Sequence, residues 1–241
     1  MSDAVLYSVD TGVATIRLNR PEARNALNLA MCDGLAAVAK AASGDPSVKL
    51  VLVRGAGSVF CAGADLKERQ GMDEAQVRAR RQKGFDAYAA LEALPMPVVA
   101  VVEGPAVGSG CEIASSCDFI MATRAASFRT PEATRGTVGA TQRLARVLGK
   151  RLAKDMMFTG RTLSAEEAMA HGLVARLVAA DQLEVELAAI VTAITGAPRQ
   201  SLRLAKRTID RGVELDPRGA LEAEIEAIEE QLASGQWMGK S

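Results

Sequence analysis

Two glutamates follow glycine- or proline-containing turns, and side chains of this kind can carry acid–base chemistry. Glu112 comes shortly after Gly108 and Gly110, and its neighbours are otherwise small or apolar. Glu132 directly follows Pro131, a pair typical of the first turn of a helix. A carboxyl group in apolar surroundings is a candidate general acid or base. The competing interpretation of Glu112 is a helix N-terminal glutamate that only complements the helix dipole; the stretch alone leaves both open.

The elements around Glu112 are a buried strand, a tight turn and the start of a helix. Residues 98–102 read VVAVV, which lacks polar alternation and predicts a strand buried on both faces. Gly104, Gly108 and Gly110 allow the backbone to turn tightly and to approach a ligand closely. A helix beginning near Ser109 would point free N–H groups and the positive end of its dipole into this turn. The turn is therefore a candidate site for an oxyanion.

The rest of the chain predicts alternating strands and helices followed by a purely helical end. We expect a core over residues 1–185 and a helical region over residues 186–241. Expected strands are residues 5–9, 13–18, 48–53, 119–122 and 173–178, and expected helices begin after Asn28, Asp73, Ser164 and Asp216. The last helix carries an apolar stripe, which needs a partner in the core or in another subunit: Leu221, Ile225, Ile228 and Leu232.

Composition excludes several classes of protein. With 29 basic and 29 acidic residues, the chain has no overall charge that would indicate a nucleic-acid partner. No apolar run is long enough to span a membrane, and the first ten residues, MSDAVLYSVD, have no leader pattern, so we expect a cytoplasmic protein. The four cysteines lack metal-site spacing and are expected to be buried thiols. The single histidine, His171, precedes Gly172 at an expected helix end and is assigned a structural role.

Nucleotide and hydrolase motifs are incomplete. Neither Gly55-Ala56-Gly57 nor Gly108-Ser109-Gly110 has the third glycine of GxGxxG, and Gly149-Lys150 lacks the first glycine of a P-loop. The sequence around Ser109 lacks the first glycine of GxSxG. These patterns favour neither a dinucleotide site nor a serine hydrolase.

Taken in order, the remaining motifs resemble the enoyl-CoA hydratase/isomerase (crotonase) family over about residues 4–235. The matching pieces are RPEARNALN (20–28), FCAGADLK (60–67), VEGPAVGSGCEIASSCD (102–118), Pro131-Glu132, GATQRLARVLG (139–149) and FTGRTLSAEEAMAHGLV (158–174). The resemblance implies an α/β spiral of repeated strand-strand-helix units, with C-terminal helices that assemble a trimer and then a hexamer. It implies an acyl-CoA substrate and no metal or redox cofactor. The balanced charge and the lack of a long apolar run predict no nucleic-acid or membrane partner.

By the same resemblance, the reaction is hydration of a 2-enoyl-CoA. Glu112 would activate water and Glu132 would protonate the α-carbon, while the backbone N–H groups of Ala62 and Ser109 would form an oxyanion hole for the thioester oxygen. The remaining residues that the resemblance places at the substrate are Arg24, Ala26, Cys61, Ala64, Asp65, Leu66, Gly108 and Arg135.

This chain departs from the family pattern at four places. Ser109 stands where glycine is usual, and its side chain could crowd the oxyanion hole or donate an extra hydrogen bond. The segment GTVGATQR after Arg135 is shorter than usual. Arg129 and Arg135 replace residues that are often apolar, which predicts a polar or carboxylated acyl group facing one of them. Arg135 could also pair with Glu132 and make it a poorer acid. The ending QWMGKS predicts that a family contact between a terminal aromatic–lysine helix and a neighbour's CoA is absent.

Two alternatives remain open from the sequence. Another reaction through the same enolate, such as double-bond isomerisation, would need Glu132 more than Glu112. A protein of the same fold with weak catalysis would bind acyl-CoA, or an RNA partner, without efficient turnover, although the balanced charge counts against RNA.

Overall fold

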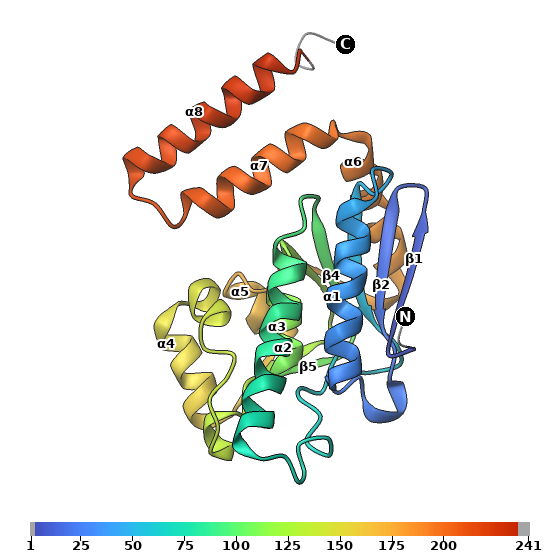
Figure 1. The fold of residues 1–241 in the computed structure, drawn as a ribbon, viewed down its shortest axis with the longest axis vertical. Helices are drawn as coiled ribbons and strands as arrows, with labels where there is room; N and C mark the ends of the chain where they lie inside the picture. The colour runs from blue at the N-terminus through green and yellow to red at the C-terminus, as the bar shows by residue number, and fades with distance from the viewer. Residues whose placement is uncertain (1–2, 236–241) are drawn as a thin grey trace.

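Two β-sheets organise the computed structural model, which describes residues 3–235 (Figure 1). The larger sheet has the order β1-β2-β3-β4-β6-β9, and the smaller has the order β5-β7-β8. The strands of the larger sheet are β1 Val5–Asp10, β2 Val13–Leu18, β3 Leu50–Gly55, β4 Val98–Val102, β6 Phe119–Thr123 and β9 Arg176–Val178. Those of the smaller sheet are β5 Pro105–Val107, β7 Ser127–Arg129 and β8 Thr162–Ser164.

Helices fill the connections between strands. They are α1 Leu29–Gly44, α2 Glu74–Glu92, α3 Ser109–Ser115, α4 Arg143–Thr159, α5 Ala165–Ala170, α6 Leu183–Gly196, α7 Arg199–Gly212 and α8 Pro217–Ala233, with short 3-10 turns at Pro21–Ala23, Ala133–Arg135 and Ala180–Gln182. The strands β1 and β2 form an antiparallel hairpin, and β2, β3, β4, β6 and β9 follow in parallel. Each crossover thus advances the chain by one strand, with α1 packed beside α2.

The segment from β4 to α3 is a strand-strand-helix unit whose two strands join different sheets. β4 pairs with β3 and β6 in the larger sheet, whereas β5 pairs with β7 in the smaller one. The chain therefore leaves the large sheet at the end of β4 and delivers α3 between the two sheets. The smaller sheet is not predicted from the sequence, because its strands are only three residues long, too short for their alternation to be distinguished from a loop.

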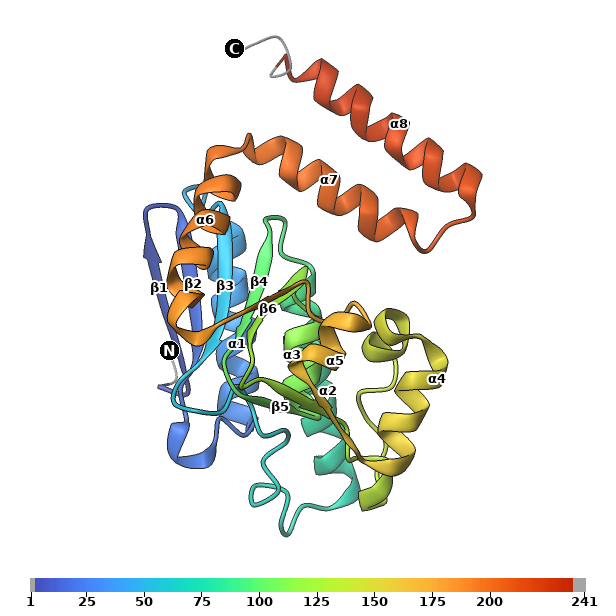
Figure 2. The same cartoon turned by 180° about the vertical axis from the view of Figure 1, so that it is seen from behind.

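Burial on both faces explains the uninterrupted apolar run of β4. Val98, Ala100 and Val102 belong to the main core beneath α1 and α2, whereas Val99 and Val101 face a second core. The second core is completed by Leu183, Leu187 and Ile190 of α6, which covers the opposite face of the sheet (Figure 2). The expected boundary at residue 185 falls inside this helix, so the chain leaves the body of the protein only after α6.

Helix caps fall where the sequence predicts them. The Asn28 side chain accepts from the Met31 N–H, Asp73 and Gln76 form a capping box at α2, and Ser164 and Glu167 form another at α5. The side chain of Asp216 accepts from the first turn of α8. The strand expected at residues 48–53 instead spans 50–55, and the last strand is only residues 176–178. Strand ends are set by pairing partners, which the sequence does not reveal.

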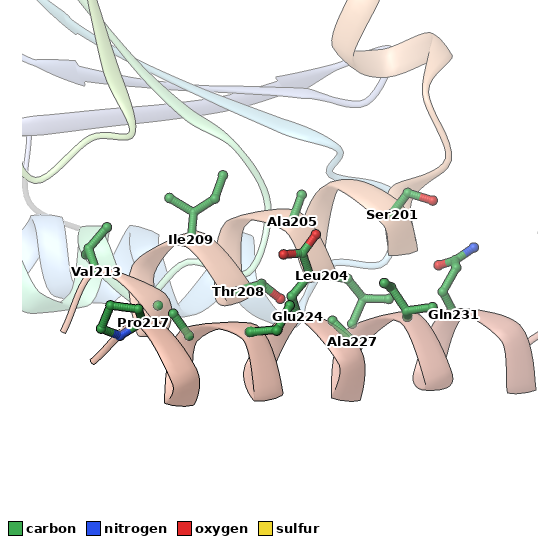
Figure 3. A pocket seen from close by; sticks show the side chains of 14 residues that line it. Ser201, Leu204, Ala205, Thr208, Ile209, Val213, Pro217, Glu224, Ala227 and Gln231 are labelled. Carbon is green, nitrogen blue, oxygen red and sulfur yellow. The ribbon is translucent and has the colours of Figure 1, made fainter. Parts of the chain in front are cut away.

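An arm made of α7 and α8 projects beyond the sheets (Figures 1 and 2), and Lys206 of α7 ties it to the body by pairing with Asp118 at 2.9 Å and donating to the Met96 carbonyl oxygen. The two helices pack on each other, and a groove of about 780 Å³ runs along them (Figure 3). Its walls include Ile209, Val213 and Leu221, whose surfaces are 65%, 75% and 56% exposed. Leu221, Ile225, Ile228 and Leu232, the stripe expected to need a partner, are likewise exposed.

The structure also bears on the expectations for the cysteines, for membrane-spanning helices and for the C-terminal contact. Cys32, Cys61, Cys111 and Cys117 are all buried and unpaired, as predicted. Within residues 3–235, none of the helices has both the length and the apolar character needed to cross a bilayer. The expected absence of a terminal contact concerns residues 236–241, which lie outside the described residues.

We expect Gly110→Ala to destabilise the fold, because a Cβ at this position would collide with the backbone carbonyl oxygen of Cys61. Such overpacking against backbone lowers the free energy of unfolding by about 1–3 kcal/mol. Gly44, at the exposed end of α1, has open space around it, so Gly44→Ala should leave stability unchanged or raise it by up to about 1 kcal/mol. Urea denaturation followed by circular dichroism compares the two variants. Equal free energies of unfolding for the two variants would contradict the close contact between Gly110 and the Cys61 carbonyl oxygen.

Candidate active site

The turn between β5 and α3 places Ser109 and Glu112 beside residues 61–63. Cys61 N–H donates to the Pro105 carbonyl at 3.2 Å, and Val107 N–H donates to the Cys61 carbonyl at 2.9 Å. Gly108 then adopts φ +51°, and α3 begins at Ser109. The first N–H groups of a helix lack intrahelical acceptors, so the Ser109 N–H is available for a ligand, as the sequence predicts.

The other turn, residues 61–65, lies along residues 24–27. Its hydrogen bonds show that the expectation for the Ala62 N–H is wrong. The Ala62 N–H donates to the Arg24 carbonyl oxygen at 3.0 Å, so it is not free for an oxyanion. Ala64 forms an isolated parallel bridge with Leu27, in which Gly63 and Asp65 supply the groups that bond to Leu27. Because successive residues of an extended segment face opposite sides, the N–H of Ala64 points away from Leu27. Ala64 therefore replaces Ala62 as the candidate donor.

A cavity of about 350 Å³ brings these turns and both glutamates together. Of the residues expected at the substrate, its wall includes Ala62, Ala64, Leu66, Gly108, Ser109, Glu112, Glu132 and Arg135. α2 supplies further wall residues, among them Arg81, Phe85 and Tyr88. The two carboxyl groups and the two candidate N–H donors thus border a single space large enough for a small acyl group.

Four of the expected substrate residues do not line this cavity. Cys61 is fully buried beneath the turn, and Asp65 pairs with Arg20 at 2.9 Å while accepting from the N–H groups of Lys67 and Glu68. Both therefore hold the turn in shape. Arg24 and Ala26 lie on the adjoining loop, where their carbonyl oxygens accept from Ala62 N–H and from the Arg20 guanidinium. Their side chains form no part of the cavity wall.

Glu132 sits at the end of the cavity formed by the shortened segment. Its Oε1 lies so close to Gly108 that any Cβ there would collide with it, and its Cγ packs against Gly139. Its Oε2 is buried without a hydrogen-bond partner among the described residues. Burial raises the pKa of Glu132, the charge of Glu112 raises it further, and Arg135 and Arg81 only partly oppose this. Glu132 and Arg135 form no ion pair among residues 3–235, so the expected pairing is wrong, although the charge of Arg135 still lowers the pKa of Glu132.

Glu112 is 6% exposed and does more than complement a helix dipole. Its Oε2 accepts from Arg143 Nη1 at 2.8 Å. Burial raises the pKa of Glu112, the Arg143 guanidinium lowers it, and Glu92 raises it again. Arg143 was missed as a site residue although it lies in the GATQRLARVLG motif. Arg143 and Glu112 are far apart in the sequence, and nothing in the sequence indicates that they are in contact.

The structure also places Ser109, Arg129 and Arg135, the residues that depart from the family pattern. The Ser109 side chain hydrogen-bonds with the Tyr88 hydroxyl, which partly offsets the rise in the pKa of Tyr88 caused by burial. This contact favours an additional hydrogen bond over crowding of the turn. Arg129 donates from Nε to the Gly160 carbonyl oxygen at 2.6 Å and does not line the cavity, whereas Arg135 does. Of the two arginines expected to face an acyl group, only Arg135 remains a candidate.

The single histidine adds no further candidate for catalysis. His171 is exposed at the end of α5, where its N–H donates to the Glu167 carbonyl, in agreement with a structural role. In the part of the chain that the structure describes, no group of three or more His, Cys, Asp or Glu side chains could hold a metal ion.

Comparisons with known proteins agree with this architecture. Residues 8–238 match the family described as Enoyl-CoA hydratase/isomerase. The Mycobacterium leprae protein named "Probable enoyl-CoA hydratase echA8" is 40% identical over 88% of this chain and 83% of its own length. The human mitochondrial protein named "Enoyl-CoA hydratase domain-containing protein 2" is 40% identical over 88% of this chain and 75% of its own.

Solved structures give the same result in three dimensions. An enoyl-CoA hydratase from Mycobacterium smegmatis superposes with a TM-score of 0.92 and 34% identity, covering 95% of this chain and 91% of that one. An enoyl-CoA hydratase from Bacillus anthracis gives 0.90 and 36% identity over 94% and 90%. Sequence, fold and cavity agree, and the chain belongs to the enoyl-CoA hydratase/isomerase family.

Proposed function

We propose that this protein hydrates a 2-enoyl-CoA thioester, adding water across the 2,3 double bond to give a 3-hydroxyacyl-CoA. The observation that carries the proposal is a pair of carboxyl groups, the buried Glu112 and the half-buried Glu132, on the wall of one cavity with the N–H groups of Ala64 and Ser109. An isomerase needs one proton carrier at the α-carbon, whereas hydration also needs a group that activates water. Two carboxyl groups at one cavity favour hydration.

In this proposal the N–H groups of Ala64 and Ser109 hold the thioester oxygen. When hydroxide adds to C3, electrons move through C2 and the carbonyl carbon onto that oxygen, and an enolate forms. Donors fixed in position stabilise this charge without reorganisation, and removing one comparable donor costs about 3–4 kcal/mol. The hydrogen bond between the Ser109 side chain and Tyr88 supports a fixed position for this turn.

The two carboxyl groups divide the proton transfers. Glu112, paired with Arg143, takes a proton from water as the oxygen attacks C3. Glu132, which has no ion pair among residues 3–235 and a raised pKa, gives its proton to C2 as the enolate collapses. Afterwards Glu112 carries a proton and Glu132 has lost one, so one proton passes between them, directly or through water, before the next turnover. Environments that separate the roles of two carboxyl groups are a recurring device in acid–base enzymes.

Replacing either glutamate tests the assignment. We expect Glu112→Gln and Glu132→Gln each to lower kcat for crotonyl-CoA by about 10²–10⁴, because each removes one proton carrier. Glu229→Gln, an exposed substitution in α8, should change nothing. Turnover is followed by loss of enone absorbance between pH 5 and 9. Because both pKa values are raised, the rate should fall at low pH as Glu112 becomes protonated and at high pH as Glu132 ionises. An enzyme that keeps most of an isomerase activity in Glu112→Gln but loses it in Glu132→Gln is an isomerase instead.

We further propose that Arg135 at the cavity wall favours an acyl chain ending in a carboxylate. Arg135 is exposed, and an ion pair of this kind is worth up to about 1 kcal/mol, or about fivefold in kcat/KM. Arg135→Ala should therefore lower kcat/KM about fivefold for an enoyl thioester with a terminal carboxylate and leave crotonyl-CoA unaffected, while Arg135→Lys retains most of the preference. Equal effects on both thioesters, or a wild type that prefers crotonyl-CoA, would refute the idea.

We also propose that the α7–α8 arm binds further copies of this chain, as a homotrimer or homohexamer. The arm projects beyond the sheets (Figure 1), and apolar side chains are exposed along both of its helices. Exposed apolar side chains that alternate with charged ones along α7 and α8 are suited to an interface with an identical arm of another copy.

Sedimentation velocity measures this association. The wild type should sediment as an oligomer, and Ile209→Asp combined with Ile225→Asp should shift it to monomer, because each substitution would bury an unpaired charge. Leu6→Asp, which changes an apolar residue of similar exposure on β1, serves as the control. A monomeric wild type, or an unchanged mass in the double variant, would overturn the assignment.

A further inference from the structure

Arg143 connects three elements behind the cavity. It is the first residue of α4, and its Nη1 donates to Glu112 of α3 at 2.8 Å. Its Nη2 donates to Oε2 of Glu92, the last residue of α2, at 2.7 Å. The guanidinium also lies 5.7 Å from the ring centre of Tyr88, within the range of a cation–π contact.

We propose that Arg143 is a positioning residue for Glu112: its guanidinium, anchored by Glu92 and Tyr88, holds one oxygen of the Glu112 carboxylate and leaves the other for the reacting water. This inference rests on the proposed hydration, in which Glu112 is the base. It assigns a role to Arg143, and through it to Glu92, which lies outside the cavity wall.

The geometry of the guanidinium is suited to this role. Arg143 donates to two different carboxylates from two different nitrogens, and its Nε is buried without a partner in residues 3–235. The side chain therefore has no hydrogen bond that competes with these two. Glu112 Oε2 is occupied, whereas Oε1 accepts no hydrogen bond from a described side chain. A carboxylate held by one oxygen keeps the other in a fixed direction, and orientation of this kind is a large part of catalytic rate.

The charges around Glu112 act in opposite directions. Burial and the charge of Glu92 from α2 raise the pKa of Glu112, whereas Arg143 lowers it; Glu132 and Tyr88 lie on the same cavity wall. Arg143 pairs with Glu112 and not with Glu132, so it distinguishes two carboxyl groups that burial alone would treat alike. The anchor Glu92 has a side chain that is 53% exposed, so most of its own charge remains solvated.

The test uses Arg143→Met, Arg143→Lys and Glu92→Gln in the full-length protein. Methionine removes the charge and the hydrogen bonds while keeping much of the volume, and lysine keeps the charge but offers a single nitrogen. Two readouts are taken for each variant. One is the pH dependence of kcat and KM with crotonyl-CoA. The other is an infrared titration of the protonated carboxyl band, assigned to Glu112 by its loss in Glu112→Gln.

We expect Arg143→Met to lower kcat about 10- to 100-fold with KM changed less than about twofold, because Arg143 acts on the base and not on the thioester. In Arg143→Met, the fall of kcat at low pH should move to higher pH by about one pH unit. Arg143→Lys should restore the position of that fall and part of kcat. Glu92→Gln should move the fall in the opposite direction, to lower pH, because Glu92 raises the pKa of Glu112.

Opposite shifts on replacing Arg143 and on replacing its partner Glu92 would not arise from a general loss of structure. The proposal is overturned if Arg143→Met leaves kcat and the Glu112 titration unchanged, or if lysine recovers neither readout in a folded protein. The infrared titration is independent of turnover. If the wild type hydrates no enoyl thioester, the proposed function fails, yet an unchanged Glu112 band in Arg143→Met would separately refute the pairing.

Discussion

The close approach of two turns, residues 61–65 and residues 105–110, is the constraint on which the site depends. Hydrogen bonds join Cys61 to Pro105 and Val107, and the Cys61 carbonyl oxygen occupies the space that a side chain at Gly110 would need. This contact brings the end of one crossover against the beginning of a helix from the next. It places two backbone N–H groups from distant parts of the chain at one cavity, where a single flexible loop would lose them to solvent or to internal hydrogen bonds.

Burying two carboxyl groups beside these turns is unfavourable unless each has compensation. Glu112 receives it from Arg143, which offsets part of the desolvation and keeps a charged form accessible. Glu132 has no such partner in residues 3–235, and a neutral carboxyl group is the form that its surroundings favour. The same cavity therefore holds two carboxyl groups whose surroundings differ, one with a cationic partner and one without.

The sheets supply rigidity to this arrangement. β4 is covered by one core beneath α1 and α2 and by another beneath α6, so the strand that leads into the site is fixed from both faces. The arm of α7 and α8 makes no contribution to the cavity wall and keeps its apolar surface exposed. The exposed apolar surface of the arm is therefore separate from the cavity.

The sequence by itself determined the elements whose signals are local. The apolar run of β4, the caps at Asn28, Ser164 and Asp216, and the positions of Glu112 and Glu132 after their turns were all readable, because each depends on neighbouring residues. Ordered motifs over most of the chain also indicated the family, which the comparisons confirm.

Only the tertiary structure decided which groups face the cavity. Ala62 and Ala64 are alike in sequence, but the hydrogen bond from Ala62 to the Arg24 carbonyl engages one N–H, and the bridge to Leu27 turns the other away from the loop. Arg129 and Arg135 are equally cationic, yet only Arg135 reaches the cavity. Arg143 and Glu112 are 31 residues apart and meet because α3 and α4 pack together. Such contacts depend on how separate elements meet in space, and no local pattern of residue types encodes them.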